Sequence, residues 1–364
     1  MTIRYLTAGE SHGPALSGII DGVPAHIHLE KKDFDSIMLK RKQGYGRGKR
    51  QIIETDEVEI LSGIIGGYTT GAPISLLIRN KDYENHISYM HPFNKPNGGE
   101  INIPLPGHAD LSGAIKYGFD DCRPIRERAS ARTTAIQVAL SVPVRKFLKD
   151  NKIFSLSFIE AIGGINANID YNLPINEQSK LIEENMPNFM TPDKSIISKW
   201  KQAIDSAKSE NTSLGGTGCV VFYGIPFGLG SHIQHDTKLD GKLAGEIMGI
   251  QGIKGVEIGN AIEISKKQNN ASDDIYINND GNIYRKTNQA GGIEGGMSNA
   301  QPLIIRFHMK PLPGGNQAKE SINLKEKKSS SIEYYRSDTC AVQSVCIVAE
   351  SLASIIIASE FLNK

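Results

Sequence analysis

The chain is poor in cysteine, with four in 364 residues. No two of these cysteines have the spacing of a metal-binding or redox pair. The sequence therefore favours buried or free thiols in a reducing compartment over a disulfide-stapled secreted scaffold. We expect a cytoplasmic protein without a metal site. The four are Cys122, Cys219, Cys340 and Cys346.

The chain also lacks an excess of charge of either sign, because 41 Lys and Arg face 40 Asp and Glu for a net charge of +1. No global field then draws it to nucleic acid or to a membrane surface, and any recognition of anions must be local. The N-terminal segment has no apolar core of signal-peptide length. We expect neither a nucleic-acid partner nor a membrane partner, and no run as apolar and long as a membrane span.

Glycine is present in modest excess, at 37 residues, which indicates many tight turns or close approach of the backbone to a ligand. Strand and helix patterns are mixed along the chain and predict an α/β (α+β) fold. The strands are expected at 3–8, 15–21, 58–65, 73–79, 154–163, 218–226 and 303–309, and the helices at 32–42, 130–149, 192–210, 236–250 and 342–362. Segment 80–104 is polar and aperiodic, and its His86 and His91 are expected at the surface.

A weak internal repeat is visible between residues 17–24 and 218–226, each followed by a helix that an aspartate begins. The repeat predicts one domain over 1–364 in two halves related by a pseudo-twofold axis. The halves are placed at about 1–150 and 214–364, with a polar helical insert at 166–211. Coincidence remains the alternative to the repeat.

The most chemically suggestive stretch is 106–132, where His108 precedes Asp110 and four arginines follow within 123–132. A histidine can exchange a proton at neutral pH, and arginines bind carboxylates and phosphates with two parallel hydrogen bonds. The pattern indicates acid–base chemistry on an anionic, phosphorylated ligand. A solvated basic helix with a structural histidine is the alternative. Ser130 is expected to cap the helix that follows.

Three further segments carry glycine beside polar groups. His12 lies in the turn 9–14 at the end of a strand, where glycine lets another group approach. Residues 40–50 alternate cations with glycine, which suits an anionic ligand, a flexible loop or an RNA-binding segment. The paired glycines of 291–299 suit either a ligand against bare backbone or a wide turn, and fit neither a dinucleotide fingerprint nor a P-loop.

Taken together, these segments resemble the chorismate synthase family from residue 3 to the last helix. Three signatures match in order: GESHGPAL at 9–16, PIRERASAR at 124–132 and RSDTCAV at 336–342, with Glu350 beyond. Five shorter blocks support them, namely GYGRGKR at 44–50, TTGAP at 69–73, PGHAD at 106–110, KGVEIG at 254–259 and GGIEGGMSN at 291–299.

The resemblance implies a lyase and flavoprotein of the shikimate pathway, which supplies aromatic amino-acid biosynthesis. Such an enzyme eliminates phosphate from 5-enolpyruvylshikimate 3-phosphate to give chorismate, using reduced FMN without net redox change. By position, His12 matches the histidine that protonates the reduced flavin. His108 matches the one that gives a proton toward the departing phosphate, and Asp338 is a further catalytic candidate near the flavin.

The resemblance also implies binding residues and an assembly. A β-α-β sandwich forming a homotetramer is expected, with NADPH as a candidate reductant and an external flavin reductase as a candidate partner. Substrate contacts fall on Ser11, Arg50 and Arg132. Cofactor contacts fall on Arg41, Arg47, Arg128, Ala129, Ser130, Gln251, Gly252, Gly295, Lys310, Pro311, Leu312, Pro313, Gly314 and Arg336.

Some positions depart from the family pattern. Leu105 stands where the family usually has an arginine, which suggests that one substrate cation is missing and that the Michaelis constant is raised. Gly314 and Gly315 replace a more usual pair in the flavin segment. A flavin-binding protein without turnover is therefore kept as an alternative to the lyase.

Overall fold

The computed structural model describes residues 2–48, 54–267, 272–314, 318–332 and 338–364. Its first sheet has four antiparallel strands in the order β1-β2-β6-β3. They are β1 (Arg4–Ala8), β2 (Ala15–Asp21), β6 (Ile74–Arg79) and β3 (Glu59–Ser62). Alternate residues of β6 are buried, so the sheet has one face on the core.

The second sheet has five antiparallel strands in the order β11-β16-β9-β7-β8. They are β11 (Ile253–Ile258), β16 (Leu303–Met309), β9 (Gly216–Tyr223), β7 (Phe154–Ile162) and β8 (Ile165–Asn166). Its middle strand β9 is buried almost throughout, as expected for a strand with neighbours on both sides.

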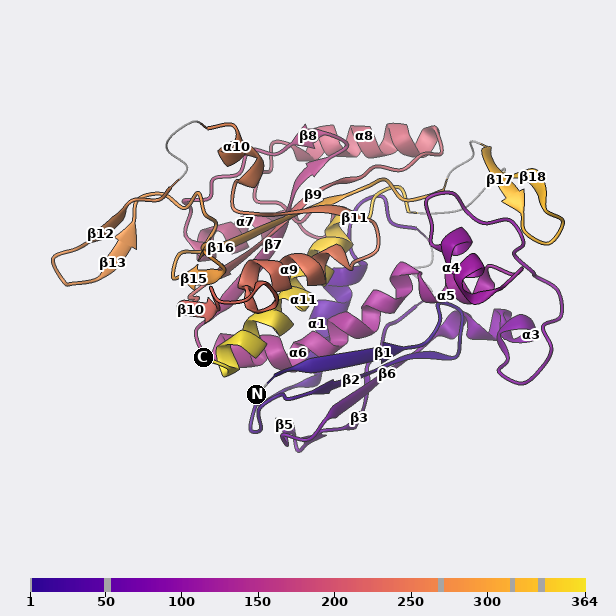
Figure 1. Ribbon diagram of the computed structural model, residues 1–364, viewed down its shortest axis with the longest axis horizontal. Helices are drawn as coiled ribbons and strands as arrows, with labels where there is room; N and C mark the ends of the chain where they lie inside the picture. The colour runs from indigo at the N-terminus through magenta and orange to yellow at the C-terminus, as the bar shows by residue number, and fades with distance from the viewer. Residues whose placement is uncertain (1, 49–53, 268–271, 315–317, 333–337) are drawn as a thin grey trace.

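Two long helices lie between the sheets, as Figure 1 shows. Helix α6 (Thr134–Asp150) packs on β1, β2 and β6, and α11 (Val342–Leu362) packs on β7 and β9. The two helices also pack against each other, and α1 (Lys31–Lys42) contacts both. The order sheet, helices, sheet confirms the expected mixed sandwich. Helix α9 (Leu239–Met248) covers β11 and a side of α11.

Helix α11 shows why hydropathy alone misleads here. By length and by its mean hydropathy of 2.0 it could cross a membrane, so the expectation of no such run was wrong. However, 78% of its most apolar window is buried inside the protein, between the two sheets. Its apolar residues are therefore those of a buried core helix.

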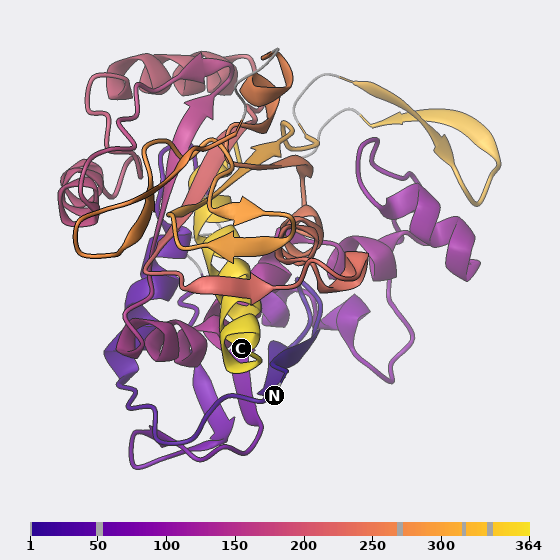
Figure 2. The ribbon, with the colours of Figure 1, turned by 60° about the vertical axis from the view of Figure 1, so that its left-hand side comes forward.

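The remaining elements lie around the two sheets and the central helices. Figures 1 and 2 show the hairpins β12–β13 and β17–β18 projecting from the rest of the molecule. The elements are β4 (Ile64–Ile65), β5 (Tyr68–Thr69), η1 (Lys81–Asn85), α3 (Ile87–Met90), α4 (Asp110–Tyr117), α5 (Arg123–Arg128), η2 (Ala131–Thr133), α7 (Ile175–Asn185), α8 (Ile197–Ser209), β10 (Phe227–Gly230), η3 (His235–Thr237), α10 (Ala261–Ser265), β12 (Ile275–Ile277), β13 (Ile283–Arg285), β14 (Ile293–Glu294), β15 (Met297–Asn299), β17 (Lys319–Asn323) and β18 (Lys328–Ile332).

Several expected boundaries differ from the structure. The strand expected at 58–65 is split at Gly63, whose φ of +82° breaks the extended chain. The helix expected from residue 130 begins at Thr134, because Ser130 instead caps the 3₁₀ turn η2 by accepting from the Arg132 N–H at 3.3 Å. The aperiodic segment 80–104 contains two helical turns, η1 and α3.

The internal repeat stays a prediction. Strands β2 and β9 each lie inside an antiparallel sheet beside a strand from earlier in the chain, β1 for β2 and β7 for β9. Each also faces one of the two central helices, α6 for β2 and α11 for β9. A pseudo-twofold axis would produce these common features. Superposition of the two halves would test the repeat.

One buried charge interrupts the apolar packing of α11. Glu350 accepts hydrogen bonds from the hydroxyls of Ser155 (2.6 Å) and Ser157 (2.7 Å) on β7, and pairs with Arg145 of α6 at 2.6 Å. Burial acts to raise the pKa of Glu350, but Arg145 and the two hydroxyls outweigh it and hold this pKa below its ordinary value. The carboxylate therefore ties both central helices to the second sheet.

We expect Glu350→Gln to lower the free energy of unfolding by about 2–3 kcal/mol at pH 7, because the charge-assisted contacts are lost. A depressed pKa stabilises the fold above the unfolded value of about 4.3, so the deficit should shrink as the pH falls through the folded pKa. Urea unfolding followed by the fluorescence of the single, buried Trp200 measures it. Glu263→Gln, in an exposed pair with Lys266, should change little, and equal midpoints for Glu350→Gln and the parent would contradict this assignment.

Candidate active site

His12 lies in the turn after β1, where its ring meets a buried carboxylate. The Nδ1 atom is 2.9 Å from both carboxylate oxygens of Glu127, on α5. The backbone N–H of His12 donates to the same carboxylate at 2.8 Å. Two contacts from one residue to one carboxylate fix both the turn and the orientation of the imidazole.

His108 is held in the same way at the start of α4. Its Nδ1 is 2.5 Å from Oδ1 of Asp110, which is fully buried. The other oxygen, Oδ2, accepts from the Leu105 N–H at 3.0 Å and from Nε of Arg126 at 2.9 Å. His108, Asp110 and Arg126 therefore form one chain of hydrogen bonds.

Both carboxylates are ionised at neutral pH. Burial acts to raise the pKa of Asp110 and of Glu127, but the hydrogen bonds from His108 and from His12 help to hold each pKa below its ordinary value. Because a carboxylate only accepts hydrogen bonds, Nδ1 of each imidazole carries a proton. The Nε2 atom of each ring is then directed to other partners, which is the arrangement that acid–base chemistry needs.

Lys310 joins three segments that the sequence assigned to the cofactor or the reaction. Its Nζ donates to the Gly107 carbonyl at 2.6 Å, and its backbone N–H donates to the Gly252 carbonyl at 2.9 Å. Gln251 donates to the Thr133 hydroxyl at 3.3 Å. The structure therefore brings 251–252, 310–314 and the start of α6 to the same place as the turn that holds His108.

The four arginines of 123–132 all have protein partners, of two kinds. Arg126 and Arg132 face carboxylates, Asp110 for the first and Asp56 and Glu54 for the second. Arg123 and Arg128 instead donate to neutral oxygens. Arg128 contacts the carbonyls of Thr7 and Gly9, which are 2.9 and 3.1 Å away, and stays exposed. The positive charge of this second pair is not cancelled by these contacts.

Arg47 and Asp338 form a further pair. Nη1 of Arg47 is 2.6 Å from Oδ2 of Asp338, and the Gly48 N–H donates to Oδ1 at 2.7 Å. Nε of Arg47 is buried and has no hydrogen-bond partner among the described residues. A buried donor without a partner is costly, so this atom is suited to an anionic ligand.

Arg41 and Arg132 lie deeper, on either side of Asp56. Arg41 is 3% exposed and Arg132 is 8% exposed, and both pair with this one buried carboxylate. The pKa of Arg41 is lowered to about 10, chiefly by burial, while the charge of Asp56 opposes this shift and that of Arg132 adds to it. Two guanidinium groups so placed act first as internal ties between α1 and the start of α6.

Comparison with known proteins shows the family and the fold of this chain. A sequence model of the chorismate synthase family matches residues 3–362. A chorismate synthase of Chlorobium limicola is 43% identical over 370 residues, spanning 100% of this chain and 93% of that protein. One of Caldicellulosiruptor saccharolyticus is 41% identical over 365 residues, spanning 100% and 95%. A crystal structure of a chorismate synthase has a TM-score of 0.79 at 33% identity, spanning 100% of this chain and 92% of that one.

The chain belongs to the chorismate synthase family. Chorismate synthases are carbon–oxygen lyases of the shikimate pathway, which leads to the aromatic amino acids, and the family depends on reduced FMN. The fold class, the enzyme class and the pathway expected from the sequence are thereby confirmed.

Not every expected site residue of the family joins this cluster. Gly295 lies in the tight hairpin β14–β15, and Figure 1 shows β15 at the opposite side of the molecule from α4 and α5. The paired glycines of 291–299, for which the sequence left a ligand site and a wide turn as alternatives, lie in a tight antiparallel hairpin. Arg50 and Arg336 lie outside the described residues. Leu105 is 3% exposed, so its side chain packs inside the protein.

Sequence reasoning missed the partners of His12. Glu127 was one acidic residue inside a basic run, and His86 was expected at the surface. Instead, His86 is half-buried, with its ring centroid 4.1 Å from that of His12 and its Nε2 3.4 Å from Asp82. Burial, followed by the charge of His12, lowers the pKa of His86. The spacing of Asp82 and His86, four residues apart, was the available signal.

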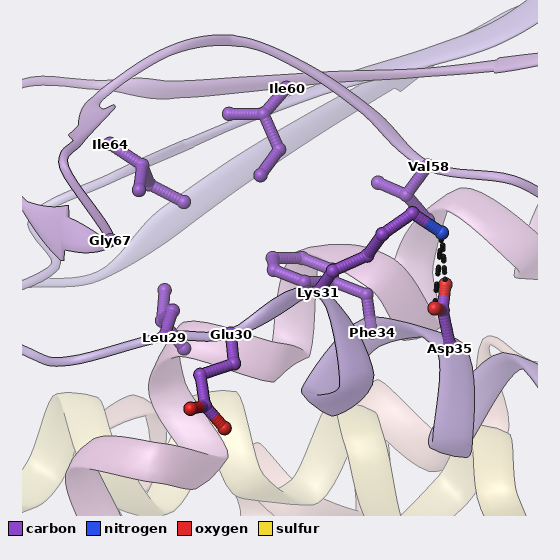
Figure 3. Close-up of a pocket in the computed structure, with 9 residues that line it drawn as sticks. All are labelled: Leu29, Glu30, Lys31, Phe34, Asp35, Val58, Ile60, Ile64 and Gly67. Carbon is purple, nitrogen blue, oxygen red and sulfur yellow. Dashed lines mark hydrogen bonds and ion pairs between the residues drawn. The ribbon is translucent and has the colours of Figure 1, made fainter.

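A pocket of about 350 Å³ lies elsewhere, between the start of α1 and β3–β5. Figure 3 shows Ile60 and Ile64 facing Leu29 and Phe34 across it. Its polar feature is the pair between Lys31 and Asp35 at the rim, at 3.0 Å. The charged side chains of this lining, Glu30, Lys31 and Asp35, are held in ion pairs, and no histidine is among the lining residues, so the candidate active site is placed at the two histidines.

We expect Asp56→Asn to lower the free energy of unfolding by about 3–5 kcal/mol, because two buried guanidinium groups lose their shared counter-charge. Urea titration of the purified chain measures this change. Asp21→Asn is the control, since Asp21 pairs with Arg4 at the surface and should matter by less than about 1 kcal/mol. Equal effects of the two substitutions would show that Asp56 does not hold these arginines.

Proposed function

We propose that this chain eliminates phosphate from 5-enolpyruvylshikimate 3-phosphate to give chorismate, with reduced FMN and no net redox change. The observation that carries this proposal is the pair of histidines, each with Nδ1 on a buried, ionised carboxylate. One such histidine could be structural. Here His108 follows Gly107, which accepts from Lys310, and both histidines are tied to α5, His12 through Glu127 and His108 through Asp110 and Arg126. The pair would supply acid groups where an anionic substrate and a cofactor meet.

Several residues of this site suit FMN. The buried Nε of Arg47 needs an acceptor, and Arg128 and Lys310 keep their positive charge because they contact neutral carbonyls. Together with backbone at 129–130, 251–252 and 311–314, they would hold the flavin and its phosphate. Bound reduced FMN supplies an electron-rich ring that assists the loss of phosphate and takes up the hydrogen. Gly295 is also proposed as a flavin contact, on the resemblance alone.

The histidines have separate roles in this proposal. His12 holds a proton at Nε2 for the reduced flavin, and Glu127 keeps its ring in place. His108 gives a proton from Nε2 to the oxygen of the departing phosphate, with Asp110 as its orienting group. General acids of this kind contribute about 10²–10⁴-fold to a rate.

The remaining charged groups are proposed to attract the anionic substrate or to hold neighbouring side chains in position. Ser11, Arg50 and Arg132 are proposed on the substrate side, with Arg132 acting from its buried ion pairs. Arg41 braces the same region through Asp56, since its guanidinium is internal. Asp338 is proposed to aim Arg47 as well as being a catalytic candidate.

The setting of the reaction is also a proposal. We propose that a homotetramer in the cytoplasm carries it out. Electrons for FMN would come from an external flavin reductase or from NADPH. Chemically reduced FMN bypasses this question in an assay, so the elimination can be tested independently of the source of electrons.

The decisive measurement is an anaerobic assay with 5-enolpyruvylshikimate 3-phosphate and chemically reduced FMN, following chorismate by absorbance. We expect turnover by the parent chain. His12→Ala and His108→Ala should each lower kcat by about 10²–10⁴-fold, because each removes a positioned acid.

The exposed His235 supplies the control, since His235→Ala should keep full activity. Absence of turnover in the parent, with FMN still bound, would overturn the lyase and leave a flavin-binding protein. Unchanged kcat in either histidine variant would remove that residue from the mechanism.

Arg128→Gln should weaken FMN binding by about 10–100-fold, because a charge-assisted contact is worth about 1.5–3 kcal/mol. Glutamine can still donate to the carbonyl of Thr7, so the turn should be kept. Flavin fluorescence titration measures the Kd. The matched control is Arg79→Gln, an exposed arginine paired with Glu59, and an equal loss in both variants would count against a specific role of Arg128.

A further inference from the structure

The cluster formed by His12, Asp82 and His86 has the composition of a transition-metal site. One nitrogen from each imidazole and one carboxylate oxygen lie within 4.8 Å of one another. Two imidazoles with one carboxylate are the ligands that Zn²⁺ takes in sites that keep a fourth position open. The proposed elimination makes no use of His86 or of Asp82.

The distances fit coordination of one ion. Nε2 of His86 is 3.4 Å from Oδ2 of Asp82, and Nε2 of His12 is 3.8 Å from the same oxygen. Ligands at about 2.0–2.1 Å from a tetrahedral ion are separated by about 3.4 Å. Small shifts of the three side chains would therefore bring both Nε2 atoms and the carboxylate oxygen within coordination distance of one metal ion.

The outer contacts also match those of bound histidines. Metal-ligating imidazoles commonly donate their second ring nitrogen to a carboxylate or another oxygen, which fixes the ring. Here Nδ1 of His12 contacts the Glu127 carboxylate at 2.9 Å, and Nδ1 of His86 contacts the Tyr89 hydroxyl. Both Nε2 atoms consequently face the Asp82 carboxylate.

Charge and access favour a cation at this point. Two carboxylates, Asp82 and Glu127, contact the imidazoles. The nearby Arg123 lies over the Tyr89 ring, 4.1 Å from its centroid, and donates to a backbone carbonyl. The side chains of His12, Asp82 and His86 are 17–26% exposed, so an ion can reach them from solvent.

We propose that His12, Asp82 and His86 bind one Zn²⁺ or a similar divalent transition-metal ion. Binding uses Nε2 of both histidines and a carboxylate oxygen of Asp82, with a water in the open position. The ion occupies the same Nε2 atom that the proposed function assigns to proton transfer. The metal-bound form is then inactive, a consequence that rests on the proposed function, whereas binding itself does not.

Co²⁺ tests the site directly, since a tetrahedral cobalt centre absorbs visible light far more strongly than the hydrated ion. Titration of the purified, flavin-free chain with Co²⁺ should give one strongly absorbing ion per chain, displaced by Zn²⁺. His86→Ala and Asp82→Asn should abolish this absorption. Glu127→Gln should weaken affinity by about 10–100-fold, as loss of an outer contact does.

His91→Ala is the matched control, because it removes an imidazole five positions along the same segment but outside the cluster. It should bind Co²⁺ as the parent does. Absorption no stronger than that of hydrated Co²⁺ in the parent would overturn the site. So would strong absorption that survives both His86→Ala and Asp82→Asn.

Enzyme assays then address the consequence separately. Zn²⁺ should inhibit the parent chain, while His86→Ala should need at least tenfold more Zn²⁺ for the same inhibition. Metal binding without inhibition would keep the site and contradict the assignment of His12 to proton transfer. A failed elimination with intact Co²⁺ binding would overturn the proposed function alone.

Discussion

The contact of α6 with α11 is the interaction on which the rest of the structure depends. Each helix faces a different sheet, so their mutual packing joins two sheets that share no strand. At the start of α6, the Thr133 hydroxyl accepts a hydrogen bond from Gln251, and the Thr134 hydroxyl accepts one from Arg41. The buried core therefore sets where the segments of the active site meet, although few catalytic groups belong to it.

Around this core, four buried carboxylates of the described residues are compensated by positive groups. Glu350, Asp110 and Glu127 are buried, and each faces arginine or histidine together with backbone or hydroxyl donors. Asp56 is buried between two arginines. An unpaired charge in such surroundings would cost several kcal/mol. The result is a rigid frame in which two imidazoles have one nitrogen fixed and the other directed outward, so their proton chemistry needs little reorganisation.

How far the sequence predicts this arrangement depends on the separation of the partners. Strand and helix periods place most elements, and the motif at 106–110 already puts His108 next to Asp110. Glu127 is 115 residues from His12, and Asp56 is 76 from Arg132, so no local pattern reveals those pairs. Gly63 interrupts a strand through its positive φ, and Ser130 caps a 3₁₀ turn ahead of the helix. Neither effect can be predicted from the pattern of apolar residues.

Counting arginines overstates the positive charge that a ligand meets. In 123–132, two of the four guanidinium groups face carboxylates and two face neutral oxygens. In the proposed site, attraction for phosphate would come mainly from Arg123, Arg128 and Lys310, while Arg126 and Arg132 would act through their ion pairs with carboxylates. The same distinction explains the histidines. A ring whose Nδ1 is held by a carboxylate keeps Nε2 available for a proton or a metal ion, and the neighbouring Asp82 would favour the ion at His12.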